Sequence, residues 1–263
     1  MGHNMMVEGK SAIITGAGSG VGRATALRFA QEGARVVCAD IAADAVKETV
    51  QQIEAAGGTA VAEQCDVSSE PDVIRVIERA VAEFGKLDII FNNVGIPTPR
   101  LGMVLVDHTV EDFDRLFAVN ARSVFLGTKH AMLQFKKQGG GGAIVNTGSV
   151  AGLVSWGGSV YGSTKGAVHQ LTKAAAIEGA PDNIRANAIC PAAMPFTGFM
   201  AAGMEGVSAE VIAQAAQLAG SIHPLGRPIT AEDCAEAVLY LASDRAANVT
   251  GVLLPLDGGY VAR

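Results

Sequence analysis

The sequence predicts an α/β domain with a doubly wound parallel sheet. Short apolar runs alternate with segments whose apolar residues recur at helical spacing, a pattern typical of parallel strands joined by helices. The runs that we interpret as strands cover residues 10–15, 35–40, 59–64, 87–91, 143–147, 184–190 and 251–256. The 263 residues suit one large domain, and 49% of them are apolar, enough for a substantial core. We therefore expect a single domain over residues 1–263, with helices on both faces of a seven-stranded sheet.

Composition excludes several classes of partner. The formal charge of −6 and the lack of a basic run argue against nucleic acid. No apolar run reaches the ~18–20 residues of a membrane span. The first residues lack a signal-peptide core, so we expect a cytoplasmic protein with no membrane partner. Neither the histidines nor the cysteines follow metal-binding spacing, so we expect no metal and reduced, buried thiols at Cys38, Cys65, Cys190 and Cys234.

The first strand leads directly into a glycine-rich turn, which is followed by a helical pattern through Glu32. Glycines let the chain turn tightly and let a pyrophosphate approach the amides at a helix N-terminus. An ordinary glycine-rich loop is the alternative, but this position favours nucleotide binding. The candidate cofactor contacts in the turn are Gly16, Gly18, Ser19, Gly20, Val21 and Gly22.

The second strand ends in Asp40, about where a ribose-binding acid is expected. Its carboxylate can accept hydrogen bonds from the adenosine ribose, whereas a 2′-phosphate would be repelled by ~4 kcal/mol per pair of unit charges at ~4 Å. Asp40 therefore predicts NAD over NADP, unless a cation such as Arg23 offsets it. An N-cap role for the next helix is compatible with the same residue. Ile41, beside it, is a further candidate contact.

The third and fourth strands also end in polar residues, and ligands bind beyond the carboxyl ends of such strands. Asp66 could bond an adenine amino group, which we favour, or cap the next helix. The candidate cofactor contacts at these ends are Asp66, Val67, Asn93 and Gly95.

Asn120 occupies a position at which the helical spacing of apolar residues predicts an apolar side chain. This apolar stripe belongs to a long helix that begins after Thr109, and it reads Phe113, Leu116, Phe117, Asn120, Val124. A buried amide needs partners, and a broken pattern often marks a functional residue. The alternative is an asparagine satisfied by local backbone at a kink.

Tyr161 and Lys165 are four residues apart, which places them on one helix face. A free tyrosine has a pKa near ~10, and a neighbouring cation favours the phenolate. A shift of roughly two to three units would make it an acid or base near neutrality. Taken alone, the pair is better explained as a Tyr and a Lys that happen to lie near each other on a solvated helix face. Ser149 follows the fifth strand and lies at the same edge of the sheet.

Residues 192–222 are rich in Ala, Met, Phe and Gly and follow the sixth strand. They are too apolar for an exposed loop, so we expect a substrate-binding flap over an apolar ligand. A pair of helices buried in a subunit interface is the alternative. A final helix follows, capped by Thr230.

The ordered motifs resemble the short-chain dehydrogenase/reductase family from about Val7 to Tyr260. They are TGAGSGVG, Asp40, CDV, NNVG, Asn120, Ser149, YGSTK, the proline after the sixth strand and LDGG. The resemblance implies a Rossmann-like domain that uses NAD or NADP without a metal and forms a homotetramer or homodimer. It also favours a catalytic role for the Tyr161–Lys165 pair.

The resemblance implies roles for individual residues. Tyr161 is the general acid/base, and Lys165 lowers its pKa and holds the nicotinamide ribose. Ser149 hydrogen-bonds the substrate oxygen, and Asn120 places a water that links Lys165 to solvent. Further cofactor contacts are Pro191, Met194 and Thr197, and the substrate pocket comprises Ser149, Val154, Trp156, Tyr161, Ile96 and parts of residues 192–204.

The chain departs from the family pattern at three places. The gap between Ser149 and Tyr161 is often one residue longer in the family, which should only shorten the loop at residues 154–158 here. Gly148 precedes Ser149, where the family often has a second serine. Pro191 is followed by AAMPFT, whereas the family usually has Pro-Gly with a threonine shortly beyond.

The sequence thus predicts an NAD-dependent oxidoreductase that interconverts a secondary alcohol and its ketone, with an apolar, cyclic or steroid-like substrate. One alternative is a 3-oxoacyl-carrier-protein reductase, which predicts NADPH and a basic docking patch. The other is a non-catalytic NAD-binding regulator on the same fold.

Overall fold

The computed structural model describes residues 5–100, 102–194 and 208–262. Seven strands form one parallel sheet in the order β3-β2-β1-β4-β5-β6-β7, which confirms the expected fold class. Their ends lie within two residues of the expected ones. The strands are β1 (Ser11–Thr15), β2 (Arg35–Asp40), β3 (Thr59–Gln64), β4 (Ile89–Asn92), β5 (Gly142–Thr147), β6 (Ile184–Pro191) and β7 (Leu253–Leu256).

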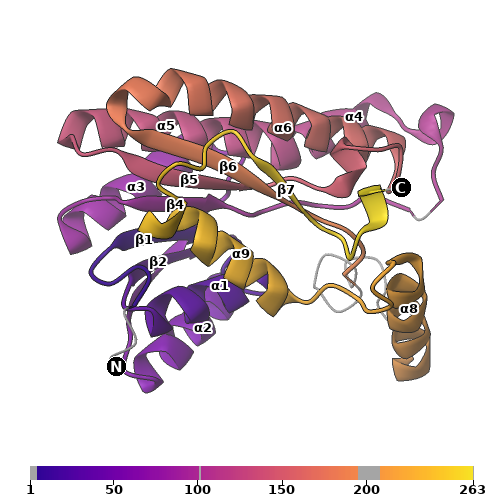
Figure 1. The fold of residues 1–263 in the computed structure, drawn as a ribbon, viewed down its shortest axis with the longest axis horizontal. Coiled ribbons are helices and arrows are strands. Elements are labelled where there is room, and N and C mark those ends of the chain that lie inside the picture. The colour runs from indigo at the N-terminus through magenta and orange to yellow at the C-terminus, as the bar shows by residue number, and fades with distance from the viewer. Residues whose placement is uncertain (1–4, 101, 195–207, 263) are drawn as a thin grey trace.

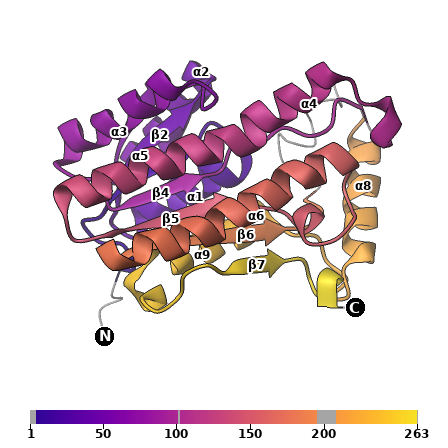
Figure 2. The same ribbon diagram turned by 90° about the horizontal axis from the view of Figure 1, so that it is seen from above.

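Helices cover both faces of the sheet (Figure 1). One face carries α1 (Gly20–Gln31), α2 (Ala43–Ala55) and α9 (Ala231–Ala242). The other carries α3 (Glu70–Phe84), α5 (Ser123–Gln138) and α6 (Ser159–Gly179), with α4 (Val110–Phe117) leading into α5. A last helix, α8 (Ala209–Ile222), lies beyond the end of the sheet, near the C-terminus (Figures 1 and 2). In the described part of the chain no helix is long and apolar enough to cross a membrane.

The strands are apolar along nearly their whole length because both faces of the sheet are buried. Side chains alternate between the two cores: Ile14 and Cys38 pack toward α1, α2 and α9. Ile13 and Val37 pack toward α3, α5 and α6. All four cysteines are free and buried, as expected.

The strand order reverses between β1 and β4, because the chain passes from the β3 edge back to the centre of the sheet. In such sheets a ligand crevice forms beyond the carboxyl ends at the reversal. The register pairs Ile14 with Phe91, so the glycine turn after β1 and the NNVG segment after β4 emerge side by side. The candidate site is built there.

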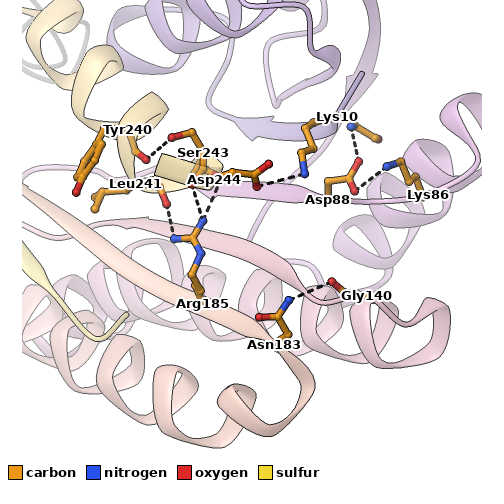
Figure 3. Close-up of polar contacts among 12 residues, drawn as sticks. Lys10, Lys86, Asp88, Gly140, Asn183, Arg185, Tyr240, Leu241, Ser243 and Asp244 are labelled. Atoms are coloured by element: carbon orange, nitrogen blue, oxygen red, sulfur yellow. Dashed lines mark hydrogen bonds and ion pairs between the residues drawn. The ribbon is translucent and has the colours of Figure 1, made fainter. Parts of the chain in front are cut away.

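The opposite end of the sheet has a structural role. Arg185 of β6 points at the last turn of α9, where helix carbonyls lack partners within the helix (Figure 3). Its guanidinium donates to the carbonyls of Leu241 at 2.7 Å, Ala242 at 3.2 Å and Ser243 at 3.1 Å. It therefore ties α9 to the sheet.

The long helix expected after Thr109 differs from expectation. Thr109 does cap it, accepting a hydrogen bond from the Asp112 amide. The helix, however, passes through a π-helical turn at Ala118–Arg122 before continuing as α5. Phe113 is 44% exposed, contrary to expectation, and stacks on the half-buried Phe117, whereas Leu116, Asn120 and Val124 are buried as expected. Turns of the π-helical kind are frequent at functional sites.

Candidate active site

The glycine turn is held closely between β1 and the start of α1. A methyl group at Gly22 would collide with the carbonyl oxygen of Gly16, so only glycine permits this approach. Ser19 is extended and precedes α1, whose first residues are Gly20, Val21 and Gly22. The turn thus presents a helix N-terminus at the crevice, a setting that suits a pyrophosphate.

Asn93 braces this turn from the neighbouring strand. Its Nδ2 donates to the Thr15 carbonyl at 3.1 Å, and its backbone amide donates to Thr15 Oγ1 at 2.9 Å. The Thr147 hydroxyl donates to Asn93 Oδ1 at 3.3 Å. Asn93 therefore links the ends of β1, β4 and β5.

Asp40 lies against the glycine turn. Oδ2 accepts the Gly18 amide and Oδ1 the Ala42 amide, each at 2.9 Å. The residue before α2 is Ala42, so Asp40 supports the entry to that helix without being its N-cap. No hydrogen bond joins Arg23 to this carboxylate among the described residues: the Arg23 guanidinium donates to the Gly18 carbonyl, Thr49 Oγ1 and Glu48. Ile41, beside Asp40, is exposed.

Asp66 is exposed and closes a local turn. Its Oδ1 accepts the amide of Ser68 at 2.9 Å and the Ser68 hydroxyl at 2.7 Å. Ser69, not Asp66, precedes α3. The adjacent Val67 is buried. The adenine contact of Asp66 stays a prediction.

Asn120 is fully buried in the π-helical turn. Its Oδ1 accepts the Ile96 amide at 2.7 Å, and its Nδ2 donates to the Ile96 carbonyl at 2.9 Å and to Thr164 Oγ1 at 3.3 Å. A methyl at Gly95 would lie 3.4 Å from both Asn120 Oδ1 and Lys165 Nζ. The amide of Asn120 is thus satisfied at a helix irregularity, but by the backbone of Ile96 in a distant segment and not by local backbone. Asn120 also lies close to Lys165, and its role in placing a water stays a prediction.

Ser149, Tyr161 and Lys165 converge at the carboxyl end of β5. The hydroxyls of Ser149 and Tyr161 are hydrogen-bonded to each other. Ser149 is buried after the strand, where its Oγ also accepts the Ala151 amide at 3.1 Å. Lys165 is 2% exposed, and its Nζ donates to the Thr147 carbonyl at 2.8 Å and lies 5.7 Å from the centre of the Tyr161 ring.

The expected lowering of the pKa of Tyr161 is not found. Burial raises the pKa of Tyr161 to about 12, and the hydrogen bond with Ser149 offsets this only in part. The ammonium of Lys165 donates to the backbone carbonyl of Thr147. Burial also lowers the pKa of Lys165 to about 8. The phenol is therefore a neutral proton donor at pH 7.

Pro191 approaches the same serine: its carbonyl lies 3.4 Å from Ser149 Oγ, which donates to it. Met194 lies near α9, where the Cys234 thiol donates to its Sδ at 3.5 Å. Thr197 and most of the expected flap lie outside the described residues. Of residues 192–222, the structure describes 192–194 and 208–222, the latter forming α8.

A cleft of about 710 Å³ lies beside the site. Val154 and Trp156 line it, as expected for substrate contacts, together with Met103, Leu105, Leu153 and the Ser155, Ser159 and Ser163 side chains. Ser149, Tyr161 and Ile96 are not among its described lining residues. Tyr161 is adjacent to Gly157, one of the residues that line the cleft: a methyl at Gly157 would be 3.9 Å from the Tyr161 ring. Among the described lining residues, none is charged.

Comparison with known proteins identifies the chain. The family model described as Enoyl-(Acyl carrier protein) reductase matches residues 16–261. The chain belongs to the short-chain dehydrogenase/reductase family. A short-chain dehydrogenase/reductase structure from Mycobacterium marinum superimposes with a TM-score of 0.89 at 33% identity, covering 99% of this chain and 98% of that one.

Two curated members of the short-chain dehydrogenase/reductase family are equally similar to this chain. The 3beta-hydroxysteroid dehydrogenase 2 of Eggerthella lenta is 37% identical over 99% of this chain and 98% of its own length. The 3-oxoacyl-[acyl-carrier-protein] reductase of Thermotoga maritima is 37% identical over 98% of this chain and 100% of its own length. This short-chain dehydrogenase/reductase is therefore an oxidoreductase acting on a CH–OH group or its carbonyl.

Sequence reasoning missed several residues of this dehydrogenase/reductase site. Thr15 and Thr147 bond Asn93, and both are the last residues of their strands, a position that could have indicated them. Tyr260 packs on Trp156 with ring centres 5.7 Å apart, a contact between distant segments that no local pattern shows. His169 follows Lys165 by one helical turn, but the histidines follow no metal-binding spacing, so the sequence did not single it out.

Proposed function

We propose that the protein is an NAD-dependent oxidoreductase that interconverts a secondary alcohol and its ketone. The observation that carries the proposal is the hydrogen-bonded Ser149–Tyr161 pair beside the buried Lys165. A phenol that can exchange a proton, next to a second hydroxyl, suits a reacting carbonyl oxygen. The pair lies at the same edge of the sheet as the glycine turn.

The residues present fit a dinucleotide cofactor. The glycine turn offers backbone amides at the start of α1, and Asp40 offers carboxylate oxygens beside it. Asp40 supports NAD, because Arg23, whose guanidinium bonds the Gly18 carbonyl beside Asp40, is engaged by Glu48 at 3.2 Å. Further cofactor contacts in this proposal are Gly95, Asp66, Val67, Pro191, Met194 and Thr197. When bound, the nicotinamide accepts or supplies the hydride.

The protein side of the reaction is a proton transfer. In ketone reduction, Tyr161 gives its phenolic proton to the carbonyl oxygen as the hydride reaches the carbonyl carbon, and Ser149 donates a hydrogen bond to the same oxygen. In alcohol oxidation, the phenolate takes the hydroxyl proton. The charge of Lys165 stabilises the phenolate, and Asn120 beside it supports a water that exchanges protons with solvent.

The cleft supports an apolar or cyclic, steroid-like substrate. Its apolar side chains, such as Leu105, Val154 and Trp156, bind hydrocarbon surface, and its serines can satisfy isolated polar groups. An anionic substrate would meet no compensating charge among the described lining residues.

We further expect a cytoplasmic homotetramer or homodimer. Exposed apolar side chains on the outer helices support self-association, since such patches often mark interfaces. They are Val110 and Phe113 on α4, Phe125 and Leu133 on α5, and Ile177 on α6.

A 3-oxoacyl-carrier-protein reductase is the second candidate, favoured by the 37% identity to the Thermotoga maritima protein. It would use NADPH and an acyl chain on an acidic carrier protein. Asp40 and the net charge of −6 oppose it. A non-catalytic NAD-binding regulator is opposed by the Ser149–Tyr161–Lys165 set.

The test is a turnover assay that monitors the absorbance of the reduced nicotinamide. The protein is given NAD or NADP together with a panel of secondary alcohols, cyclic alcohols and hydroxysteroids. We expect turnover with NAD and an uncharged cyclic substrate. Activity confined to NADPH and 3-oxoacyl carrier protein would establish the second candidate. NAD binding with no turnover over the panel and the acyl substrate would favour the regulator.

A further inference from the structure

His169 lies on α6 one turn beyond Lys165 and two turns beyond Tyr161. Residues four apart share a helix face, so all three side chains point toward the end of β5. The imidazole is 4% exposed, and burial lowers its pKa to about 4. A neutral imidazole is therefore buried against the turn that carries Ser149.

The imidazole contacts both ends of the Ser149 turn. Its Nε2 lies 3.4 Å from the Ser149 amide nitrogen and 3.3 Å from Cys190 Sγ. The ring is also hydrogen-bonded to the backbone of Gly152. The Ser149 amide can only donate, so Nε2 accepts and the ring proton lies on Nδ1. The histidine thus connects α6, β6 and the turn that carries Ser149.

The two glycines that flank the turn make room for this ring. A methyl at Gly148 would lie 2.6 Å from His169 Nε2, and a methyl at Gly152 would lie 2.6 Å from His169 Cε1. Real side chains essentially never approach so closely. Gly148 is the position at which this chain departs from the family's frequent pair of serines. Glycine at 148 and histidine at 169 are therefore sterically matched.

We propose that His169 is the positioning residue for Ser149: its neutral imidazole holds the Gly148–Gly152 turn so that the Ser149 hydroxyl meets that of Tyr161. Gly148 is part of the same device, because a second serine there would displace the ring. The catalytic consequence rests on the proposed oxidoreductase function, whereas the steric match and the tautomer do not.

A purely structural role predicts something different. A buried histidine that only fills space would be replaced by leucine with a loss of stability and little change in the chemistry. A positioning histidine works through the acceptor at Nε2. The amide oxygen of glutamine reaches about as far along the side chain as Nε2, so glutamine should replace this acceptor and leucine should not.

The first experiment compares His169→Leu, His169→Gln and, as a control outside the site, His130→Leu. We expect His169→Leu to lower kcat at least about tenfold, the scale of one lost positioning contact. The KM for NAD should stay within about twofold, since the glycine turn is untouched. His169→Gln should recover most of kcat. Equal kcat values for Leu, Gln and wild type, or equal losses in both His169 variants, would overturn the proposal.

The second experiment is independent of turnover. Melting temperatures are compared for wild type, Gly148→Ser, His169→Ala and the double variant. We expect Gly148→Ser to cost at least twice as much in the wild type as in the His169→Ala background, where the ring is gone. Additive effects would contradict the steric match. Imidazole ¹⁵N spectra, assigned with His169→Gln, should show the proton on Nδ1, and a proton on Nε2 would overturn the acceptor role.

If the wild type turns over none of the substrates tested, the proposed function fails. The melting cycle and the spectra then still decide whether His169 holds the Ser149 turn.

Discussion

The carboxylate of Asp40 accepts a hydrogen bond from the backbone amide of Gly18, with 2.9 Å between nitrogen and Oδ2. A second hydrogen bond, from Ala42, fixes the other oxygen. A negative charge is thereby held at the glycine turn, in an orientation that the side chain cannot easily leave. A cofactor with a phosphate at this place would meet that charge directly.

Asp40→Asn is expected to reduce the preference for NAD over NADP by at least about 30-fold, or ~2 kcal/mol, because it removes the charge while keeping an acceptor for Gly18. The measurement is kcat/KM with each cofactor. Asp44→Asn removes an equal charge from an exposed carboxylate paired with Lys47, and it should leave the ratio unchanged. If the ratio of kcat/KM with NAD to kcat/KM with NADP is the same in both variants, the charge of Asp40 does not set the cofactor preference.

The raised pKa of Tyr161 predicts opposite pH profiles for the two reaction directions. The phenol is protonated at neutral pH, so ketone reduction has its proton donor in place. Alcohol oxidation needs the phenolate, whose fraction grows as pH rises. We therefore expect the oxidation rate to increase from about pH 6 to about pH 8, the range in which Lys165 keeps its charge, and the reduction rate not to increase. Oxidation that is flat or falls over this range would contradict the role of Tyr161.

Arg185 is expected to stabilise the fold without taking part in catalysis. Arg185→Met leaves the carbonyls of Leu241, Ala242 and Ser243 without this donor, which should cost about 2–4 kcal/mol of unfolding free energy. Lys47→Met, which breaks an exposed ion pair, should cost less than about 0.5 kcal/mol. Urea unfolding compares the two, and equal costs would show that Arg185 does not hold α9.

His169 is expected to make the stability fall with acid. Its folded pKa is lowered to about 4 from 6.5, mainly by burial and further by Lys165 and Lys173, while the nearby Cys190 is uncharged. Between these values the unfolded chain binds the proton and the folded chain does not. Stability is therefore full above pH 6.5 and declines as pH falls toward 4, by up to about 3 kcal/mol. His169→Leu should flatten this part of the unfolding profile, and an unchanged profile would assign the acid sensitivity elsewhere.

The sequence could predict what depends on local pattern. The apolar runs, the glycine turn and the polar strand ends lie where expected, because a sheet buried on both faces leaves few alternatives. Asn120 stood out for the same reason, as a polar residue on an apolar stripe. Its π-helical turn could not be foreseen, since it depends on bonds between Asn120 and Ile96 in another segment.

The rest of the site depends on distant contacts. The spacing of Tyr161 and Lys165 indicated a shared helix face, but the pKa of the phenol depends on its burial and on its hydrogen bond with Ser149. Trp156 and Tyr260 meet only because the C-terminal segment returns to the cleft. The side chain that a methyl at Gly148 would meet belongs to His169, which lies far from Gly148 in the sequence.

The central claim is that Tyr161 transfers the proton. It is tested most directly by single-turnover reduction of a ketone substrate with Tyr161→Phe, beside Tyr240→Phe, an exposed tyrosine on α9. With NADH as the hydride donor, we expect Tyr161→Phe to bind NADH within about twofold of wild type and to lose at least about 10²-fold in the chemical step, the scale of general acid catalysis, with Tyr240→Phe unaffected. A Tyr161→Phe variant that reduces the ketone at the wild-type rate would contradict the account.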